Sequence, residues 1–330
     1  QDLITYLGTR LVASIPVEIK LPWSTMDEYF KFLEENNPAV NVAPLAAQGA
    51  IRIHEMGFAK GKPTPEQMAN MKAELKKAME AGCVGMSSGL VYMPGEYSNA
   101  EEIGELCSVM QEYDGFYVTH MRSEGAQIWE AIDEAIEIAQ RGGVRLAISH
   151  LKLLGNDVWN QTDRLFARLD KARSEVKELA YDAYPYDAGC TSLGALLPPW
   201  VFEGGAAKML ERIQDPEVRV KMRHDMENGL PGWQNFWKCA GGWAGFPIAT
   251  VNNKESEWVM GQTVQALADQ AGKDPFEWAF DFLAHENGRV QVILMGMKDE
   301  DVATILARPE TMVGSDSMSL AETGILGTGM

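Results

Sequence analysis

Residues 116–152, FYVTHMRSEGAQIWEAIDEAIEIAQRGGVRLAISHLK, decide the predicted fold class. The two ends of this stretch, FYVTHMR (116–122) and RLAISHLK (145–152), predict short β-strands, and the segment between them predicts an amphipathic helix ending at Gly142. A strand and a helix within about 30 residues form the repeat of a parallel β/α fold, in which all strands point the same way. The stretch therefore predicts an α/β protein with a parallel sheet.

Each of these two strands carries a histidine near its carboxyl end, His120 on the first and His150 on the second. In a (β/α)₈ barrel the catalytic residues collect at that end of the strands. Because the two side chains occupy the same position in consecutive repeats, we interpret them as ligands of one metal ion, with a structural role as the alternative. A downstream strand, TMVGSDS (311–317), places Asp316 at a third strand end, as a catalytic carboxylate or as the cap of a following helix. This set favours metal-assisted hydrolysis.

Further β/α units are predicted on both sides of this stretch. Thr64-Pro65-Glu66-Gln67 combines an N-cap, a proline at the first helical position and a capping-box glutamine, and it predicts a helix running to Ala81. Ser98-Asn99-Ala100-Glu101 predicts a second capping box. Strands recur roughly every 30–40 residues, as in a barrel. The other predicted strands are VNVAPLAA (40–47), CVGMSSGL (83–90), ELAYDAYPY (178–186) and TMVGSDS (311–317).

The regular spacing stops after Tyr186. We interpret residues 188–310 as an insertion within a partial barrel that spans residues 1–330. A further strand in the insertion, RVQVILMG (289–296), is interpreted as related to the barrel. Long insertions on barrel loops usually cover the active-site face, so we expect a lid, with a peripheral subdomain as the alternative.

Composition argues against several functional classes. The net charge of −18 over 330 residues disfavours nucleic-acid binding, because phosphate contacts need clustered Lys and Arg. No apolar run is long enough to span a membrane, and no signal peptide opens the sequence. Four widely spaced cysteines favour a reducing, cytoplasmic compartment, although an export signal upstream of Gln1 would not be visible.

The remaining histidines, His54, His224 and His285, lack partners in the pattern and are not predicted to bind metal.

Six motifs spread over residues 41–317 occur in the order found in one enzyme family. They are NVAPL (41–45), AMEAGCVGMSSGLVYMPGEYS (78–98), YVTHMRSEG (117–125), ISHLK (148–152), DAYPY (182–186) and VGSD (313–316). In these motifs the chain resembles the D-aminoacylase, or N-acyl-D-amino-acid deacylase, family of the amidohydrolase superfamily. The resemblance implies a (β/α)₈ TIM barrel and zinc-dependent hydrolysis of N-acyl-D-amino acids to a carboxylic acid and a D-amino acid.

The resemblance also implies roles for individual residues. His120 and His150 match the histidines that bind the catalytic zinc. Asp316 matches the aspartate that activates the water and passes its proton to the leaving amine. Tyr92 and Tyr184 match residues that hold the substrate's carboxylate or polarise its amide carbonyl.

Two basic residues are further candidates for substrate binding. Lys152, which also matches a family position, lies two residues after His150 and faces the same side by strand alternation. It is either an anchor for a carboxylate or a charge at the rim. Arg122 stands in the same relation to His120.

The chain departs from the family's pattern at four places. The family's HxH pair and its metal-ligating cysteine would lie upstream of Gln1, and a histidine-proline-arginine turn would lie beyond Met330. We therefore expect a fragment that lacks the first two barrel strands and the C-terminal segment, and that is poorly soluble, inactive and weak in zinc binding. Ala47-Gln48-Gly49 stands where relatives commonly have Gly-His-Gly, and Cys190 stands near a position where they often have a small hydroxyl residue.

Two other functions remain open at this point. One is hydrolysis of cyclic amides, as in hydantoinases and dihydroorotases, and the other is a non-catalytic barrel that acts as a binding module. The expected partner is a small N-acyl amino acid, with no nucleic acid and no membrane. The sequence does not predict the oligomeric state.

Overall fold

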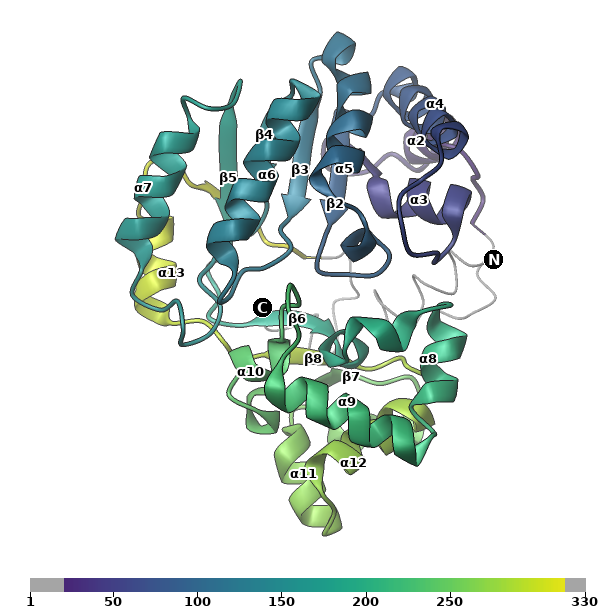
Figure 1. Cartoon of the computed structure of the whole chain (residues 1–330), viewed down its shortest axis with the longest axis vertical. Helices are drawn as coiled ribbons and strands as arrows, with labels where there is room; N and C mark the ends of the chain where they lie inside the picture. The colour runs from purple at the N-terminus through teal and green to yellow at the C-terminus, as the bar shows by residue number, and fades with distance from the viewer. Residues whose placement is uncertain (1–20, 318–330) are drawn as a thin grey trace.

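The computed structural model describes residues 21–317, and a parallel sheet is its central feature. Six strands lie in the order β1-β2-β3-β4-β5-β9, each parallel to its neighbours, and the sheet is open (Figure 1). The strands are β1 (Leu45–Ala47), β2 (Gly85–Gly89), β3 (Phe116–His120), β4 (Arg145–Ile148), β5 (Leu179–Ala183) and β9 (Met312–Val313). The predicted α/β class with a parallel, incomplete barrel sheet is confirmed.

Helices precede and separate the parallel strands, in keeping with the predicted rhythm (Figure 1). They are α2 (Met26–Asn36), α3 (Gln48–Met56), α4 (Pro65–Ala81), α5 (Ala100–Cys107), α6 (Ile128–Gly142), α7 (Thr162–Ala172) and α13 (Asp299–Leu306). The predicted end of α6 at Gly142 is confirmed, and the next residue, Gly143, has φ +63°, a left-handed conformation that glycine adopts without strain. Buried Ile132, Ala135 and Ile136 form the inner face of α6.

The two predicted capping boxes have different outcomes. Thr64 caps α4 with the predicted box: its hydroxyl accepts the Gln67 N–H while the Gln67 side chain accepts the Thr64 N–H. The box predicted at Ser98 is wrong by one residue, because Asn99 Oδ1 accepts the Glu102 N–H and caps α5 instead. The Ser98 hydroxyl is therefore available for a different contact.

Most of the predicted insertion forms a second unit around a three-stranded antiparallel sheet in the order β6-β8-β7. Its strands are β6 (Gly189–Ser192), β7 (Ile248–Thr250) and β8 (Gln291–Leu294). Its helices are α8 (Ala206–Arg212), α9 (Pro216–Asn228), α10 (Phe236–Cys239), α11 (Val264–Ala271) and α12 (Pro275–His285). The barrel relation predicted for residues 289–296 is wrong, because β8 pairs antiparallel with β6 and β7 and, among the described residues, pairs with no strand of the parallel sheet.

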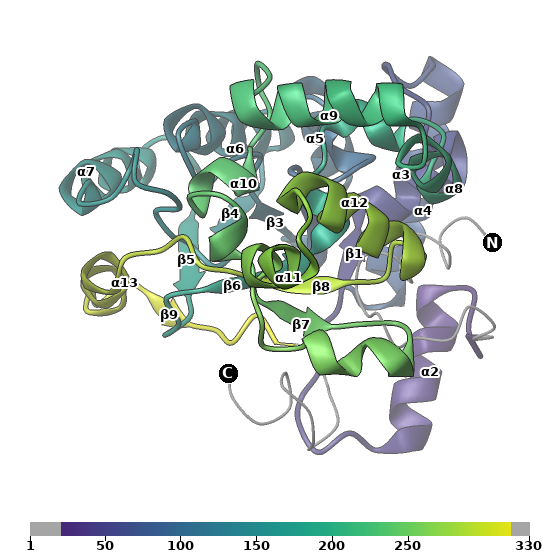
Figure 2. The same ribbon diagram turned by 90° about the horizontal axis from the view of Figure 1, so that it is seen from below.

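This second unit has its own apolar core and lies beyond the carboxyl ends of the parallel strands (Figures 1 and 2). Phe246 and Phe280 are among its fully buried side chains. After β8 the chain returns to the first unit, where α13 packs against α7 and β5, and β9 then pairs with β5. Within residues 21–317, no helix has both the length and the apolar character required to cross a membrane.

Candidate metal centre

The two predicted histidines lie side by side at the carboxyl ends of β3 and β4. His120 Nδ1 is 3.0 Å from His150 Nε2, and the two ring centroids are 4.5 Å apart. His150 has φ +40°, a conformation that costs energy for a residue other than glycine, and its N–H donates to Asp182 Oδ1 at 2.8 Å. The backbone after β4 is thus held by β5 in the position that turns His150 toward His120.

Glu124 is a third member of this group, and the sequence reasoning missed it. Its Oε1 is 2.9 Å from His150 Nδ1 and forms an ion pair with Lys152 Nζ, and its Oε2 is 3.9 Å from His120 Nε2. One potential ligand atom from each of His120, Glu124 and His150 lies within 4.8 Å of the others. The signal was available, since Glu124 belongs to the THMRSEG motif four residues after His120.

The electrostatics of the group favour a neutral imidazole beside a carboxylate. Burial lowers the pKa of His120 to about 3; the Glu124 carboxylate opposes this shift, while His150 and Lys152 add to it. Burial acts to raise the pKa of Glu124, but Lys152 and the two histidines outweigh it and hold that pKa well below its usual range. Metal ligation requires deprotonated donors, and His120 and Glu124 meet that condition at neutral pH.

The residues present fit a divalent metal such as zinc. Two nitrogens bound to one tetrahedral zinc at roughly 2.0–2.1 Å lie about 3.3 Å apart, close to the 3.0 Å between His120 Nδ1 and His150 Nε2. A small ring movement would accommodate the ion.

Tyr92 and Tyr184 lie next to the histidines, and their roles in substrate binding stay predictions. The Tyr92 ring centroid is 5.2 Å from that of His120, and its hydroxyl is 3.2 Å from Thr191 Oγ1 on β6. The Tyr184 ring centroid is 6.3 Å from that of His150, and Lys152 Nζ lies 5.2 Å from it. Burial, followed by the negative charges of Glu124 and Asp316, raises the pKa of Tyr184. The Tyr184 hydroxyl is therefore protonated at neutral pH.

Asp316 follows β9 with an exposed side chain and φ +48°. The Gly314 N–H donates to Ala183 O at 3.0 Å, so the chain before Asp316 is tied to β5. Burial, followed by the charge of Asp316, raises the pKa of Cys190 to about 11. The negative charge of Asp316 thus acts on both Cys190 and Tyr184.

No protein-family model matches the chain. It is 32% identical to an N-acyl-D-glutamate deacylase of Alcaligenes xylosoxydans xylosoxydans over 52% of this chain and 35% of the relative. It is also 32% identical to a D-aminoacylase of the same organism, over 50% of this chain and 34% of the relative. A solved D-aminoacylase structure superposes with a TM-score of 0.68 and 25% identity, covering 88% of this chain and 51% of that one.

A second solved structure agrees in fold. It is an N-acyl-D-glutamate deacylase from Bordetella bronchiseptica complexed with zinc and a phosphonate inhibitor, with a TM-score of 0.71, 24% identity, and coverage of 94% of this chain and 54% of that one. In sequence and in fold the chain is similar to D-aminoacylases. The resemblance predicted from the motifs is confirmed. The chain spans about a third of the length of these curated relatives and about half of the solved structures.

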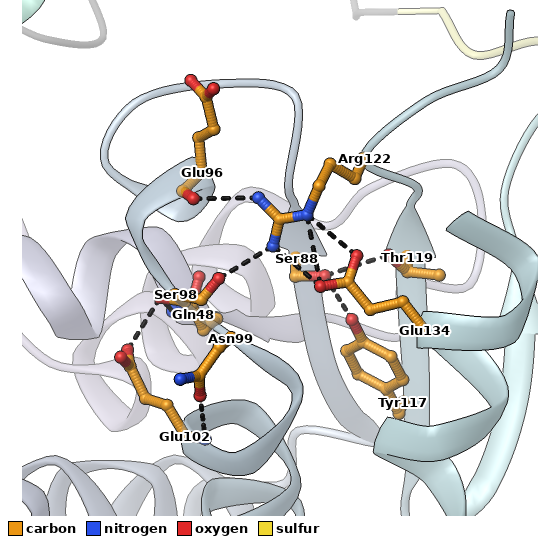
Figure 3. A network of polar contacts seen from close by, with 10 residues as sticks. All are labelled: Gln48, Ser88, Glu96, Ser98, Asn99, Glu102, Tyr117, Thr119, Arg122 and Glu134. Carbon is orange, nitrogen blue, oxygen red and sulfur yellow. Dashed lines mark hydrogen bonds and ion pairs between the residues drawn. The ribbon is translucent and has the colours of Figure 1, made fainter. Parts of the chain in front are cut away.

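Arg122 does not join the other predicted site residues. Its guanidinium contacts the loop after β2 and the helix α6 (Figure 3). In the loop, Nη1 donates to Glu96 O and Nη2 donates to Ser98 O, both at 2.8 Å. On the helix, Glu134 Oε2 accepts from Nε at 2.9 Å. Strand alternation fails here because β3 ends at His120, so residue 122 is no longer in a strand. Its predicted role in substrate binding stays a prediction.

The loop after β2 is also fixed from the other side, by Gln48. Gln48, which the sequence analysis placed at the expected histidine of a Gly-His-Gly motif, is fully buried. Its Nε2 donates to Ser98 Oγ at 2.9 Å, and Ser98 Oγ donates to Glu102 Oε1 at 2.7 Å (Figure 3). Arg52 Nε also donates to Glu102 Oε1, at 3.2 Å. The loop that carries Tyr92 is therefore held from both sides.

The other three histidines lie outside the group. His54 is exposed, and His224 and His285 have side chains that are 71% and 56% exposed, with carboxylates of adjacent residues as neighbours.

Proposed function

We propose that the protein is a zinc-dependent amidohydrolase that converts N-acyl-D-amino acids to a carboxylic acid and a D-amino acid. The observation that carries this proposal is the facing pair His120 Nδ1 and His150 Nε2, 3.0 Å apart at adjacent strand ends. The relatives whose names specify N-acyl-D-glutamate, N-acyl-D-aspartate and D-amino acid deacylation support the substrate class.

His120 and His150 would hold the zinc, which supplies a polarised carbonyl and a water with lowered pKa when it is bound. Asp316 would act as the general base, taking a proton from the attacking water and giving it to the leaving amine. Its exposed carboxylate can accept a proton without first breaking an ion pair, because no cation pairs with it among the described residues.

Substrate binding is assigned to Tyr92, Tyr184 and Lys152. The two rings lie beside the histidines, and we assign their hydroxyl groups as donors to the amide carbonyl. Lys152 Nζ, a donor of three hydrogens, already contacts Glu124 and can offer a remaining hydrogen to the free carboxylate of an N-acyl amino acid.

We further propose that the insertion, residues 188–310, forms one wall of the site. Thr191 contacts the Tyr92 hydroxyl, and Gln234 accepts the backbone N–H of Glu124. The Gly155 N–H also donates to Gly296 O at 2.7 Å. These contacts support a fixed cover over the metal centre.

The test is hydrolysis by the zinc-loaded protein. N-acetyl-D-glutamate, N-acetyl-D-aspartate and N-acetyl-D-leucine are compared with their L-enantiomers and with a hydantoin and dihydroorotate. We expect release of the free D-amino acid only. Hydrolysis of the cyclic amides would support the hydantoinase-like alternative, and bound zinc without any turnover would support a binding module.

The same assay addresses the expected inactivity of residues 1–330. The chain is compared with a version extended to the length of the relatives, and turnover by the extended version alone would support the fragment prediction. We also propose a cytoplasmic location, which the four free cysteines support and which cell fractionation would check.

A further inference from the structure

We propose that Glu124 is a positioning residue that fixes the proton of His150 on Nδ1 and thereby leaves Nε2 free to bind metal. This inference rests on the proposed zinc binding by His120 and His150. Glu124 lies in the motif YVTHMRSEG, but the sequence alone predicted no role for it.

The first step is the contact itself. Glu124 Oε1 lies 2.9 Å from His150 Nδ1, and an ionised carboxylate can only accept a hydrogen bond. Nδ1 must therefore carry the hydrogen, which leaves a lone pair on Nε2. That atom is the one facing His120 Nδ1 at 3.0 Å. Metal-binding histidines usually donate their second N–H to such a carboxylate, which sets the tautomer and the ring orientation.

The second step is the competition from Lys152. Its Nζ lies 2.8 Å from the same His150 Nδ1, and an ammonium group can only donate. Without Glu124, Lys152 would donate to Nδ1, and the imidazole would have to carry its hydrogen on Nε2. That hydrogen would occupy the position of the metal. Glu124 accepts from both groups and so decides between the two tautomers.

The third step is how firmly Glu124 is held. Its side chain is almost fully buried, its N–H donates to Gln234 Oε1 from the insertion, and its carbonyl accepts the Leu154 N–H at 2.9 Å. A plain ion pair with Lys152 would explain the burial but not the contact with Nδ1. The two explanations predict different tautomers when Glu124 is changed.

The experiment combines the tautomer of His150 with zinc affinity. In the metal-free 330-residue chain, long-range ¹H–¹⁵N correlations report which ring nitrogen of His150 carries the hydrogen, with His150→Gln for assignment. We expect Nδ1–H in the wild type and a shift toward Nε2–H in Glu124→Gln. Competition with a chromophoric chelator should show a loss of zinc affinity of about 10- to 100-fold for Glu124→Gln.

Three further variants make the test specific. Glu130→Gln removes an exposed carboxylate from the first turn of α6 and should change neither readout. Lys152→Met should keep the wild-type tautomer. Glu124→Gln combined with Lys152→Met removes both charges, which protects the fold against an unpaired buried ammonium, and should recover part of the lost zinc affinity because the competing donor is gone.

The outcomes separate this inference from the proposed function. If the wild type binds no zinc, zinc binding at the two histidines fails, whereas the tautomer measurement still decides the role of Glu124. An Nε2–H tautomer in the wild type, or unchanged tautomer and zinc affinity in Glu124→Gln, would overturn the positioning role. A loss of zinc affinity with the Nδ1–H tautomer retained would also overturn it and make Glu124 a direct ligand.

Discussion

Asp316 follows β9 and has an exposed carboxylate. Its negative charge contributes to the raised pKa of Tyr184 and of Cys190. If it is the general base, Asp316→Asn should leave zinc content unchanged while kcat falls about 100-fold or more, since an amide cannot take the proton. Metal analysis and steady-state kinetics of an active, zinc-loaded version check both parts. Unchanged turnover would remove Asp316 from the mechanism.

His120 makes the stability of the metal-free protein depend on pH. Its pKa is lowered to about 3 in the folded chain and returns to about 6.5 on unfolding, so the unfolded chain binds more protons between these values. Stability should therefore fall as the pH drops below about 6.5, by at most about 2 kcal/mol between pH 7 and pH 5. The depressed pKa of Glu124 acts in the same direction below about 4.3.

Urea unfolding at pH 7 and pH 5 measures this dependence. His120→Gln should flatten it, whereas His224→Gln, which changes an exposed histidine, should not. Equal pH dependence in the wild type and in His120→Gln would show that His120 is not held neutral by the fold.

At the level of the elements, Arg122 joins β3, α6 and the loop after β2 through contacts to Glu134, Glu96 and Ser98. Arg122→Met should lower the free energy of unfolding by about 2 kcal/mol, since hydrogen bonds to charged groups contribute about 1.5–3 kcal/mol each and part of the loss is recovered by water. Amide exchange in residues 90–99 should quicken. Denaturant unfolding and hydrogen-exchange mass spectrometry give the two readouts.

Arg141→Met is the matched control on the same helix. Arg141 pairs with Glu137 in a half-exposed i,i+4 contact, which contributes at most about 1 kcal/mol. If both variants lose the same small amount of stability, the Arg122 contacts do not fix the loop.

The elements also show where sequence reasoning works and where it stops. The repeat in 116–152 predicted β3, α6 and β4 because each has a clear apolar period and Gly142 marks the helix end. The strands β6, with the sequence GCTS, and β7, with the sequence IAT, were missed because neither shows an alternation of apolar and polar residues. Glu124 was missed for a related reason: it lies in a loop, where no repeat predicts which way a side chain points.

For the molecule as a whole, the open parallel sheet has β1 and β9 at its edges. On β9, Met312 is 50% and Val313 is 73% exposed. Exposed apolar edge strands promote association, and a charged side chain at the edge opposes it. Val313→Lys should therefore raise the soluble fraction of the expressed chain, measured by centrifugation and size-exclusion chromatography.

Val220→Lys provides the control for this substitution. Val220 is 72% exposed but lies on the helix α9, away from any sheet edge, so the same gain in charge should have less effect. A similar gain in solubility from both variants would attribute the effect to net charge alone.

The hydrogen bond from the Glu124 N–H to Gln234 crosses from one folding unit to the other. A recombinant chimera that takes residues 188–310 from a different family member would therefore exchange part of the support of the metal centre along with the outer wall. Designers who graft such segments to alter substrate preference should retain a hydrogen-bond acceptor at position 234. They should also retain Gly155 and Gly296, because a Cβ on Gly155 would lie 3.1 Å from Cys239 Cα and one on Gly296 would lie 2.8 Å from Leu154 Cδ1.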